Sequence, residues 1–274
     1  MNINNNLILQ TYDPDDLIQK SRPILIPIST PLSLNERKIF DFYLSKINSH
    51  MPDNYTVRVE KSELEKILGV KYITNQDLNK FLKGLLNKKI FLEDIVSKEN
   101  KSDVGGGINV MAEATMRKDA ETGRQIITLS ASHVLWPYIF NIESLGYVKY
   151  RAYILPEIKS LYTYNLFTYI LANRWRMRKN KKYWDEGIET FYDFMGVEGD
   201  YMRTFNRFKE KVLNPSIKAL ANENIFNISY EVIKPWKKVE MIRFRLHNSE
   251  NELKKKIPEE VRVEAENLGL ALTY

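Results

Sequence analysis

Apolar residues along the chain follow two spacings, and the same order of spacings occurs twice. Leu64, Ile67 and Leu68 have the three-and-four spacing of one face of a short helix, which ends at Gly69. The same pattern returns 127 positions later (64 to 191, 69 to 196), as Phe191, Phe194 and Met195 before Gly196. The sequence therefore predicts an internal repeat.

A second helix follows in each half at the same offset. Leu78, Phe81 and Leu85 correspond to Phe205, Phe208 and Val212, which predicts one apolar face in both copies. With one insertion near Pro215, residues 87–91 then match residues 222–226, where helix gives way to strand. Helix, tight turn, helix and β-hairpin describe a winged helix-turn-helix. The predicted fold class is α+β, with two tandem winged helix-turn-helix domains.

The pattern also predicts the bounds of the remaining elements. In the first copy we expect a helix at 34–48, a strand at 56–59, the helix pair within 62–88, and strands near 90–97, 108–116 and 125–130, with Gly105–Gly107 at the wing tip. In the second copy we expect a long helix at 156–177, the pair at 187–195 and 200–222, and a hairpin whose alternation runs from Phe226 to Val232 and from Ile242 to Leu246.

Proline marks two further helix starts. Asn214 as N-cap and Pro215 as first residue predict a new helix that sets off at an angle. Pro258, Glu259 and Glu260 predict a short docked helix in the tail. A length of 274 residues favours two domains. We place them at 1–145 and 146–250, followed by a charged tail at 251–274.

Composition excludes several protein classes. Hydrophobic residues make up 43% of the chain, which excludes wholesale disorder. No apolar run is long enough to span a membrane, and the first residues lack the pattern of a secretory signal. The absence of cysteine excludes disulfides and thiolate metal sites. These features predict a soluble protein of a reducing compartment such as the bacterial cytoplasm.

The net charge of +6 is unevenly distributed. Residues 1–145 hold 18 Lys and Arg against 18 Asp and Glu, whereas residues 146–274 hold 23 against 17. A basic surplus in one half favours a module that binds a polyanion, although scattered lysines on a solvated surface would give the same count. The charge therefore favours double-stranded DNA as partner.

The second helix of the C-terminal copy carries the main predicted contact face. Arg203, Arg207 and Lys211 share one side of that helix, with Asn206 beside them. Arginine and asparagine can bond bidentately to guanine and adenine in the major groove. The alternative is a solvated helix face. The matching face of the first copy holds Asn75, Gln76, Asn79, Lys80 and Lys83, and Lys80 and Lys83 are predicted either to contact DNA or to meet a partner protein.

Other cations suit the DNA backbone. Arg243 and Arg245 share the strand face opposite Ile242 and Phe244, near Lys237 and Lys238 at the turn. They suit phosphates or the minor groove, and the alternative is a charged edge strand. A dense run near the end of the long helix is expected to position the backbone, unless it only offsets the helix dipole: Arg174, Arg176, Arg178, Lys179, Lys181 and Lys182. The six tyrosines between residues 147 and 169 favour core packing over base stacking.

Catalytic signatures are missing from the sequence. It contains neither a phosphate-binding P-loop nor the glycine pattern of a dinucleotide site. His50, His133 and His247 are isolated, so the histidine pair that would hold a metal beside a nucleophilic tyrosine is absent. We therefore expect no enzymatic activity, no cofactor and no metal.

These residues resemble the Rep initiators of iteron plasmids. Three stretches carry the likeness: residues 32–48, 196–221 and 226–246. The middle stretch is the most specific and contains Phe208, Lys209, Val212, Leu213, Pro215, Ile217 and Lys218. We include Lys218 among the expected DNA contacts. The sequence departs from the family pattern at the second wing, where Pro235-Trp236-Lys237-Lys238 replaces the usual short turn with glycine and arginine.

The resemblance implies binding to directly repeated origin sequences, mainly through the C-terminal domain. It also implies opening of nearby AT-rich DNA and recruitment of the host initiator and the replicative helicase. A monomer would initiate, and a homodimer formed through the N-terminal domain would repress or restrain copy number. Two alternatives remain from the sequence: a winged-helix transcriptional repressor and a strand-nicking replication enzyme.

Overall fold

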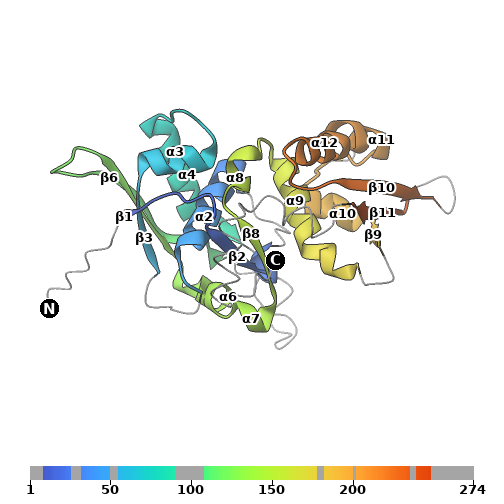
Figure 1. Ribbon diagram of the computed structural model, residues 1–274, viewed down its shortest axis with the longest axis horizontal. Helices are drawn as coiled ribbons and strands as arrows, with labels where there is room; N and C mark the ends of the chain where they lie inside the picture. The colour runs from blue at the N-terminus through green and yellow to red at the C-terminus, as the bar shows by residue number, and fades with distance from the viewer. Residues whose placement is uncertain are drawn as a thin grey trace, which may run out of the picture. The chain divides into compact units, whose positions relative to one another are not determined.

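The computed structural model describes residues 9–25, 32–49, 55–90, 108–177, 182–199, 202–234 and 239–247. Helices and short strands alternate along the chain (Figure 1). They form two compact units. Unit 1 comprises Met1–Ala172 and Asp193–Val197, and unit 2 comprises Asn173–Tyr192 and Glu198–Tyr274.

The helices at the centre of unit 1 begin and end at residues suited to caps. They are α2 (Leu34–Lys46), α3 (Lys61–Leu68) and α4 (Asn75–Asn87). Ser33 and Glu36 form a capping box at the start of α2, and the Thr74 side chain accepts the Asp77 N–H at 3.0 Å at the start of α4. Gly69 ends α3 with a φ of 69°, a conformation that favours glycine. The helix pair predicted within 62–88 is confirmed.

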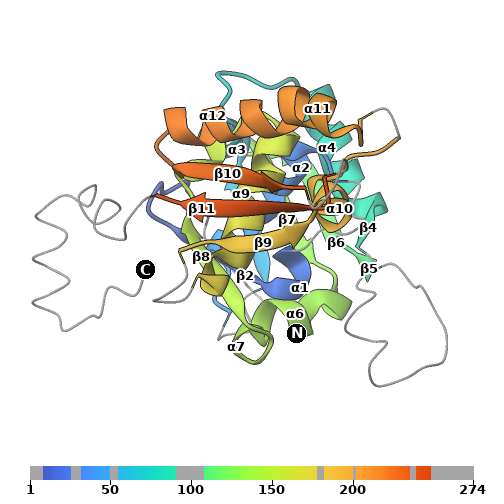
Figure 2. The same ribbon diagram turned by 90° about the vertical axis from the view of Figure 1, so that its right-hand side faces the viewer.

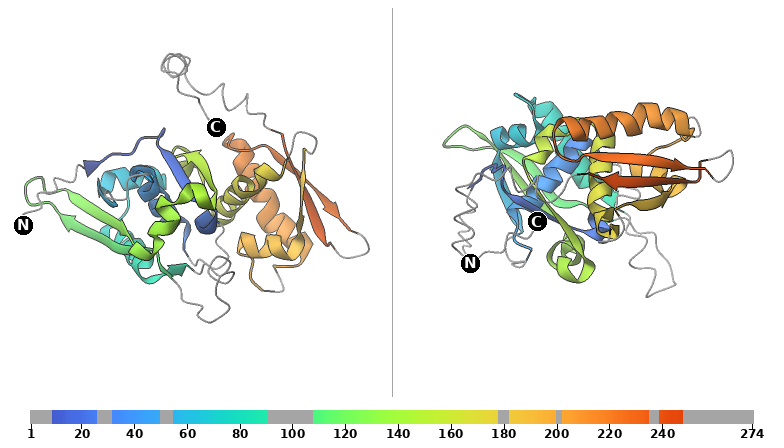
Figure 3. Two further views of the ribbon diagram at one scale, coloured as in Figure 1. Left: turned by 90° about the horizontal axis from the view of Figure 1, so that it is seen from below. Right: turned by 45° about the vertical axis from the view of Figure 1, so that its right-hand side comes forward.

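A four-stranded sheet completes this helix-turn-helix. Its order is β1 (Leu9–Gln10), β3 (Thr56–Glu60), β7 (Gln125–Ala131) and β6 (Met111–Lys118), with β1 parallel to β3 and the other pairs antiparallel. Val57, Val59, Ile127 and Leu129 alternate with polar residues and are buried. The long hairpin β6–β7 projects beyond the helices of unit 1 (Figure 3, left).

The strands on either side of the first predicted wing differ from the sequence pattern. The strand expected at 108–116 is divided into β5 (Ile108–Asn109) and β6, and β5 pairs with β4 (Lys89–Ile90). The rest of the strand expected at 90–97, and the tip Gly105–Gly107, lie outside the described residues.

Unit 1 continues beyond the boundary expected at residue 145. β8 (Tyr147–Arg151) pairs antiparallel with β2 (Leu17–Ser21), so residues 146–151 belong to the N-terminal fold. The remaining elements of unit 1 are short: α1 (Arg22–Leu25), η1 (His133–Leu135), α6 (Trp136–Phe140), α7 (Ile142–Leu145) and α8 (Ile154–Glu157). The expected boundary therefore falls between α7 and β8, inside unit 1.

The single helix predicted at 156–177 is wrong in its bounds. α8 ends at Glu157, and α9 runs from Leu161 to Asn173, followed by the 3-10 turn η2 (Arg174–Arg176). Ser160 separates the two helices because its Oγ accepts the Thr163 N–H at 3.0 Å, as an N-cap does. Phe167 and Tyr169 on α9 are buried, as are Tyr150 and Tyr164, which confirms the predicted core role for these residues. Tyr147, Tyr153 and Tyr162 are only half-buried.

Unit 2 combines a second helix-turn-helix with a three-stranded sheet. Its elements are β9 (Trp184–Gly187), α11 (Phe205–Phe208), the π-helical segment η3 (Lys209–Leu213), α12 (Asn214–Asn222), β10 (Ile228–Ile233) and β11 (Met241–Leu246). The first helix of its helix-turn-helix, α10 (Ile188–Met195), belongs to unit 2 as far as Tyr192, and its last residues are assigned to unit 1. The sheet order is β10-β11-β9, and α11 continues into α12 beside it (Figure 2). The hairpin is confirmed, whereas β9 was not predicted. The tail helix expected after Pro258 lies outside the described residues.

Candidate nucleic-acid interface

Aromatic packing fixes the rotation of the second helix in unit 2. Phe208 is fully buried, and its ring meets Tyr192 at 4.8 Å and Phe191 at 5.6 Å, both nearly edge to face. Phe191 in turn contacts Phe244 of β11 at 5.0 Å. Such aromatic contacts add to the burial free energy and restrict orientation. The helix side opposite Phe208 must therefore face away from the core of unit 2.

A π-helical turn keeps this helix on the core over its whole length. The residues buried after Phe208 are Val212, Leu213, Ser216 and Leu220. In a regular α-helix, at about 100° per residue, Phe208, Leu213 and Leu220 would spread over about 140°. The wider π turn at Lys209–Leu213 takes up one extra residue and returns the later side chains to the core face.

The N-cap role predicted for Asn214 is wrong, although α12 begins at that residue. Asn214 has helical dihedral angles (φ −61°, ψ −45°), and its side chain caps nothing. Instead, its Oδ1 accepts a hydrogen bond from the Tyr230 hydroxyl at 2.8 Å. Pro215 follows in the first turn of α12, where the π segment before it accommodates the missing N–H. The helix therefore continues through this point rather than restarting.

The outward side of this continuous helix carries four of the predicted DNA contacts. Asn206, Arg207, Lys211 and Lys218 are all exposed. Asn206 and Arg207 lie in the first turn, the part of a recognition helix that enters the major groove most deeply. The structure thus brings together an arginine, an amide and two lysines on one polar face.

Arg203 does not belong to that helix. α10 ends at Met195, and α11 begins at Phe205 rather than near residue 200. Arg203 lies between the two helices, half-buried, with its guanidinium 3.4 Å from the Glu189 carboxylate. The first copy has a turn of only residues 69–74. This longer second turn is why the repeat misplaced Arg203.

The two arginines of the second hairpin are engaged within the sheet. Arg243 forms a bidentate ion pair with Asp185 (2.7 and 3.0 Å) and lies over the Tyr183 ring. Arg245 pairs with Glu231 at 3.2 Å. β11 is the central strand, so the alternative of a charged edge strand is wrong. A phosphate contact by Arg243 would have to compete with its bidentate carboxylate partner.

The dense basic run is only partly described. Arg176 donates to Glu186 at 2.7 Å and to the Asp185 carbonyl at 2.6 Å, so it braces the start of β9. Arg174 is half-buried in η2. Lys182 is exposed. The other members, Arg178, Lys179 and Lys181, together with Lys237 and Lys238 of the second wing, lie outside the described residues.

In unit 1, α4 presents the corresponding helix face. Leu78, Leu82 and Leu85 are buried on one side, whereas Lys80 and Lys83 are exposed on the other. Phe81, predicted on the buried face, is only half-buried because Leu82 takes the inward position. The exposed face is polar and carries no arginine.

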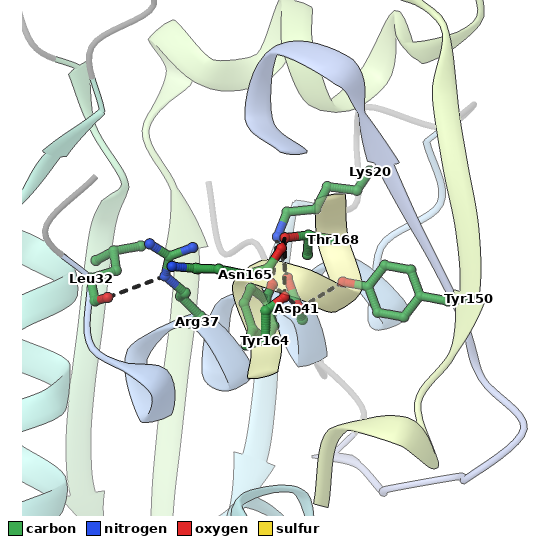
Figure 4. Close-up of polar contacts among 8 residues, drawn as sticks. All are labelled: Lys20, Leu32, Arg37, Asp41, Tyr150, Tyr164, Asn165 and Thr168. Atoms are coloured by element: carbon green, nitrogen blue, oxygen red, sulfur yellow. Dashed lines mark hydrogen bonds and ion pairs between the residues drawn. The ribbon is translucent and has the colours of Figure 1, made fainter. Parts of the chain in front are cut away.

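Sequence reasoning missed a buried polar cluster in unit 1 (Figure 4). Asp41 of α2, fully buried, accepts hydrogen bonds from Lys20 (2.7 Å), Tyr150 (2.6 Å) and Tyr164 (2.5 Å), and Lys20 also donates to the Tyr164 hydroxyl at 2.9 Å. These four side chains come from α2, β2, β8 and α9. Their separation along the chain leaves no local pattern that could have revealed the cluster.

The electrostatic environment of this cluster favours the protonated forms of Lys20, Tyr150 and Tyr164, the three donors to Asp41. Burial, followed by the Asp41 charge, raises the pKa of Tyr164 to about 12 and the pKa of Tyr150 well above its usual value. Burial by itself lowers the pKa of Lys20, but Asp41 and the hydrogen bonds outweigh it and raise that pKa. Nearby, burial lowers the pKa of Arg37, which donates to the Leu32 carbonyl at 3.2 Å. The cluster ties four elements together and offers no open site.

Neither a metal cluster nor a membrane span emerges from the described part of the chain. Among those residues, no three His, Asp or Glu side chains gather closely enough to hold a metal ion. No described helix has the length and apolar character needed to cross a bilayer.

Comparison with known families decides the chain's affiliation. Residues 18–171 match the family model described as Initiator Replication protein, WH1, and residues 187–246 match Initiator Rep protein, WH2. The chain belongs to the initiator Rep protein family. The two matched domains confirm the α+β fold of tandem winged helices and the resemblance to the Rep initiators of iteron plasmids.

One solved structure supports the fold of this Rep protein. The crystal structure of Pi initiator protein in complex with iteron DNA has a TM-score of 0.68 and 18% identity, and the alignment covers 87% of this chain and 100% of that one. Domains 2 and 3 of RctB align with a TM-score of 0.48 and 10% identity over 79% of this chain and 83% of that one. No curated protein sequence matches the chain.

Proposed function

We propose that this Rep protein initiates plasmid replication by binding directly repeated origin sequences, the iterons, in double-stranded DNA. One observation carries the proposal: the second helix of the unit 2 helix-turn-helix turns Asn206, Arg207 and Lys211 outward from an aromatic core that fixes its rotation. Family membership supports the role in initiation, and the iteron DNA in the Pi initiator complex supports the ligand.

The residues divide between base reading and backbone contact. Arg207 and Asn206 read base edges, because arginine bonds bidentately to guanine and asparagine to adenine. Lys211, Lys218, Lys237 and Lys238 bind phosphates, as do Arg174 and Arg178 of the basic run. Arg203, Arg176, Arg243 and Arg245 would reach phosphates only by leaving their carboxylate partners, and Lys80 and Lys83 add an auxiliary contact from unit 1.

The partners follow from the same role. The protein opens nearby AT-rich DNA and recruits the host initiator and the replicative helicase without a chemical step of its own. Unit 1 also mediates a homodimer in equilibrium with the initiating monomer. The protein acts in the cytoplasm.

Footprinting on the non-coding DNA beside the gene tests the proposal. We expect protection of several direct repeats, and a plasmid carrying only the gene and that repeat array should replicate. Protection of a promoter without plasmid maintenance would instead identify a transcriptional repressor. Nicked supercoiled DNA with covalently attached protein would overturn the assignment in favour of a strand-nicking enzyme.

A further inference from the structure

A cavity of about 360 Å³ lies on the outer face of the four-stranded sheet in unit 1. Arg58 of β3 is paired with Thr128 of β7, and Ile126 of β7 is paired with Arg117 of β6, so these four side chains share one face of the sheet. They line the cavity together with residues at the end of the β6–β7 hairpin. The opposite face of the sheet packs into the core, so the cavity belongs to the outer surface of unit 1.

Arg58 and Arg117 come to the cavity from the two strands that flank β7. Neighbouring strands lie about 4.8 Å apart, so the strands that carry the two arginines are about 10 Å apart. Within the part of the chain that the structure describes, neither guanidinium group pairs with a carboxylate or donates a hydrogen bond. Arg124 of the same hairpin differs, because it pairs with Glu60 at 2.6 Å. The two cavity arginines therefore have donors available for a ligand.

The cavity also holds two carboxylates, and both already accept hydrogen bonds within the hairpin. Asp119 Oδ1 accepts the Thr122 N–H and the Thr122 hydroxyl, each at 2.8 Å. These bonds, with a smaller contribution from the Arg58 charge, lower the pKa of Asp119. Glu113 Oε1 accepts the Thr115 hydroxyl at 3.1 Å. The charged lining residues are three cations against two carboxylates, a net charge of +1 that favours an anionic ligand: Arg58, Arg117, Lys118, Glu113 and Asp119.

The mixture of groups in the cavity suits a small phosphate ester that carries a sugar and a ring. Guanidinium groups bind phosphate oxygens through pairs of parallel hydrogen bonds. A carboxylate has about four acceptor positions, of which Glu113 uses one, so Glu113 can also accept from a sugar hydroxyl. Ile126, which is buried, adds an apolar contact. The volume lies at the lower end of the range for small-molecule sites and is too small to admit a base-paired duplex.

We propose that this cavity binds a nucleoside diphosphate or triphosphate. Arg58 and Arg117 hold the phosphates from either side, the Thr128 hydroxyl donates to a phosphate oxygen, and Glu113 accepts from the sugar. Binding is reversible and involves no chemical step. None of the residues proposed to contact DNA lines the cavity, so this inference goes beyond the proposed function and is independent of it.

Calorimetric titration and thermal melting of the full chain with ADP, pyrophosphate and adenosine test the inference. We expect ADP to bind more tightly than pyrophosphate, because it adds the sugar and ring contacts, and we expect adenosine, which lacks phosphate, not to bind. ADP at about 100 times its Kd should raise the melting temperature by about 5 to 10 °C. The inference is overturned if ADP does not bind, if adenosine binds as tightly as ADP, or if ADP binds no more tightly than pyrophosphate.

Arg58→Gln and Arg117→Gln remove the two proposed phosphate donors, and each should weaken ADP binding about 10- to 150-fold. Arg117 is exposed, so its variant keeps the core of unit 1 intact even if replacing the half-buried Arg58 does not. Arg124→Gln is the matched control, because it removes the same charge from the same hairpin at a residue that pairs with Glu60 and does not line the cavity. It should bind ADP as the unaltered protein does, and equal weakening by all three variants would overturn the inference.

Binding of the protected repeat separates this inference from the proposed function. Both cavity variants should bind the repeat as the unaltered protein does. If they lose repeat binding or change the dimer equilibrium while their affinity for ADP is unaltered, the two arginines contact DNA or a second copy of the chain, and the inference is overturned. If the unaltered protein binds ADP but does not distinguish the repeat from a shuffled duplex, the proposed function fails and the nucleotide site remains.

Discussion

At the scale of the residue, the burial of Phe208 determines what Arg207 can do. Because Phe208 is locked among aromatic rings, its neighbour projects outward from the first turn of α11. We expect Arg207→Ala to weaken binding to the repeat by about 1 to 3 kcal/mol and to relax preference at one base position. Fluorescence anisotropy on repeats with single base changes would measure both effects.

Arg151→Ala is the charge-matched control for Arg207. Arg151 pairs with Asp15 at 3.0 Å in unit 1, so its removal changes the net charge equally without touching α11. We expect it to leave base preference unchanged. Equal losses on repeat and random DNA for Arg207→Ala would contradict a base contact and point to phosphate.

The buried cluster makes stability depend on alkaline pH. Since the pKa of Tyr164 is raised to about 12, the folded protein keeps a phenolic proton that the unfolded chain loses above about pH 10. Its contribution, about 3 kcal/mol, is therefore present at neutral pH and is lost between about pH 10 and 12. The raised pKa values of Tyr150 and Lys20 act in the same direction.

Urea unfolding between pH 8 and pH 11.5 would measure this dependence. Tyr164→Phe should lower stability at pH 8, because it removes a donor to the buried Asp41, yet lose less stability on going to pH 11.5. Tyr72→Phe, which alters an exposed ring, should behave as the unaltered protein does. An unchanged pH dependence in Tyr164→Phe would show that the hydroxyl does not titrate as the cluster requires.

At the scale of the element, the repeat predicted the first helix of each pair well. α3 and α10 each span eight residues (61–68 and 188–195), and both end at a glycine with positive φ, Gly69 and Gly196. These features come from local spacing and a local stop, which sequence records directly. Turn length and the π segment depend on how a whole helix meets its core, so the sequence misplaced Arg203 and gave Asn214 the wrong role. The Asp41 cluster depends on partners up to 144 positions apart, beyond any local pattern.

Because of the π segment, we expect the protein to tolerate the deletion of one residue there better than the deletion of one residue in the regular helix α4. Removing Glu210, an exposed residue of the π turn, would leave Phe208, Val212, Leu213, Ser216 and Leu220 on the three-and-four spacing of a regular α-helix. We expect the melting temperature to fall by only a few degrees. Removing Lys80 from the regular helix α4 would instead rotate Leu82 and Leu85 by about 100° out of the core. Thermal melts compare the two, and equal destabilisation would contradict the role given to the π turn.

At the scale of the whole molecule, the two winged helices repeat one architecture but carry different chemistry. The excess positive charge lies entirely after residue 145, where 23 Lys and Arg face 17 Asp and Glu. The exposed face of α11 includes an arginine, Arg207, whereas α4 contains amides and lysines but no arginine. If both faces bind one duplex, we expect the long-range attraction to phosphate to come mainly from unit 2.

Because the positive charge is concentrated in unit 2, we expect the loss of one phosphate contact there to change the salt dependence of DNA binding without changing base preference. Lys218 is exposed on α12, beyond the first turn that we propose reads bases, where a recognition helix would leave the groove and meet the backbone. Lys218→Ala should weaken binding to repeat and random DNA alike. It should also reduce the slope of log K against log salt by about 1, because one phosphate contact and its released counterion are lost.

Lys149→Ala in β8 provides the control for that slope, since Lys149 lies over the Tyr147 ring in unit 1 and takes no part in the proposed contacts. Its slope should match that of the unaltered protein, whereas Arg207→Ala should change base preference as well as affinity. If Lys218→Ala left the salt slope unaltered but changed the ratio of repeat to random binding, Lys218 would contact bases rather than the phosphate backbone. The reading face would then extend from α11 through the π turn into α12.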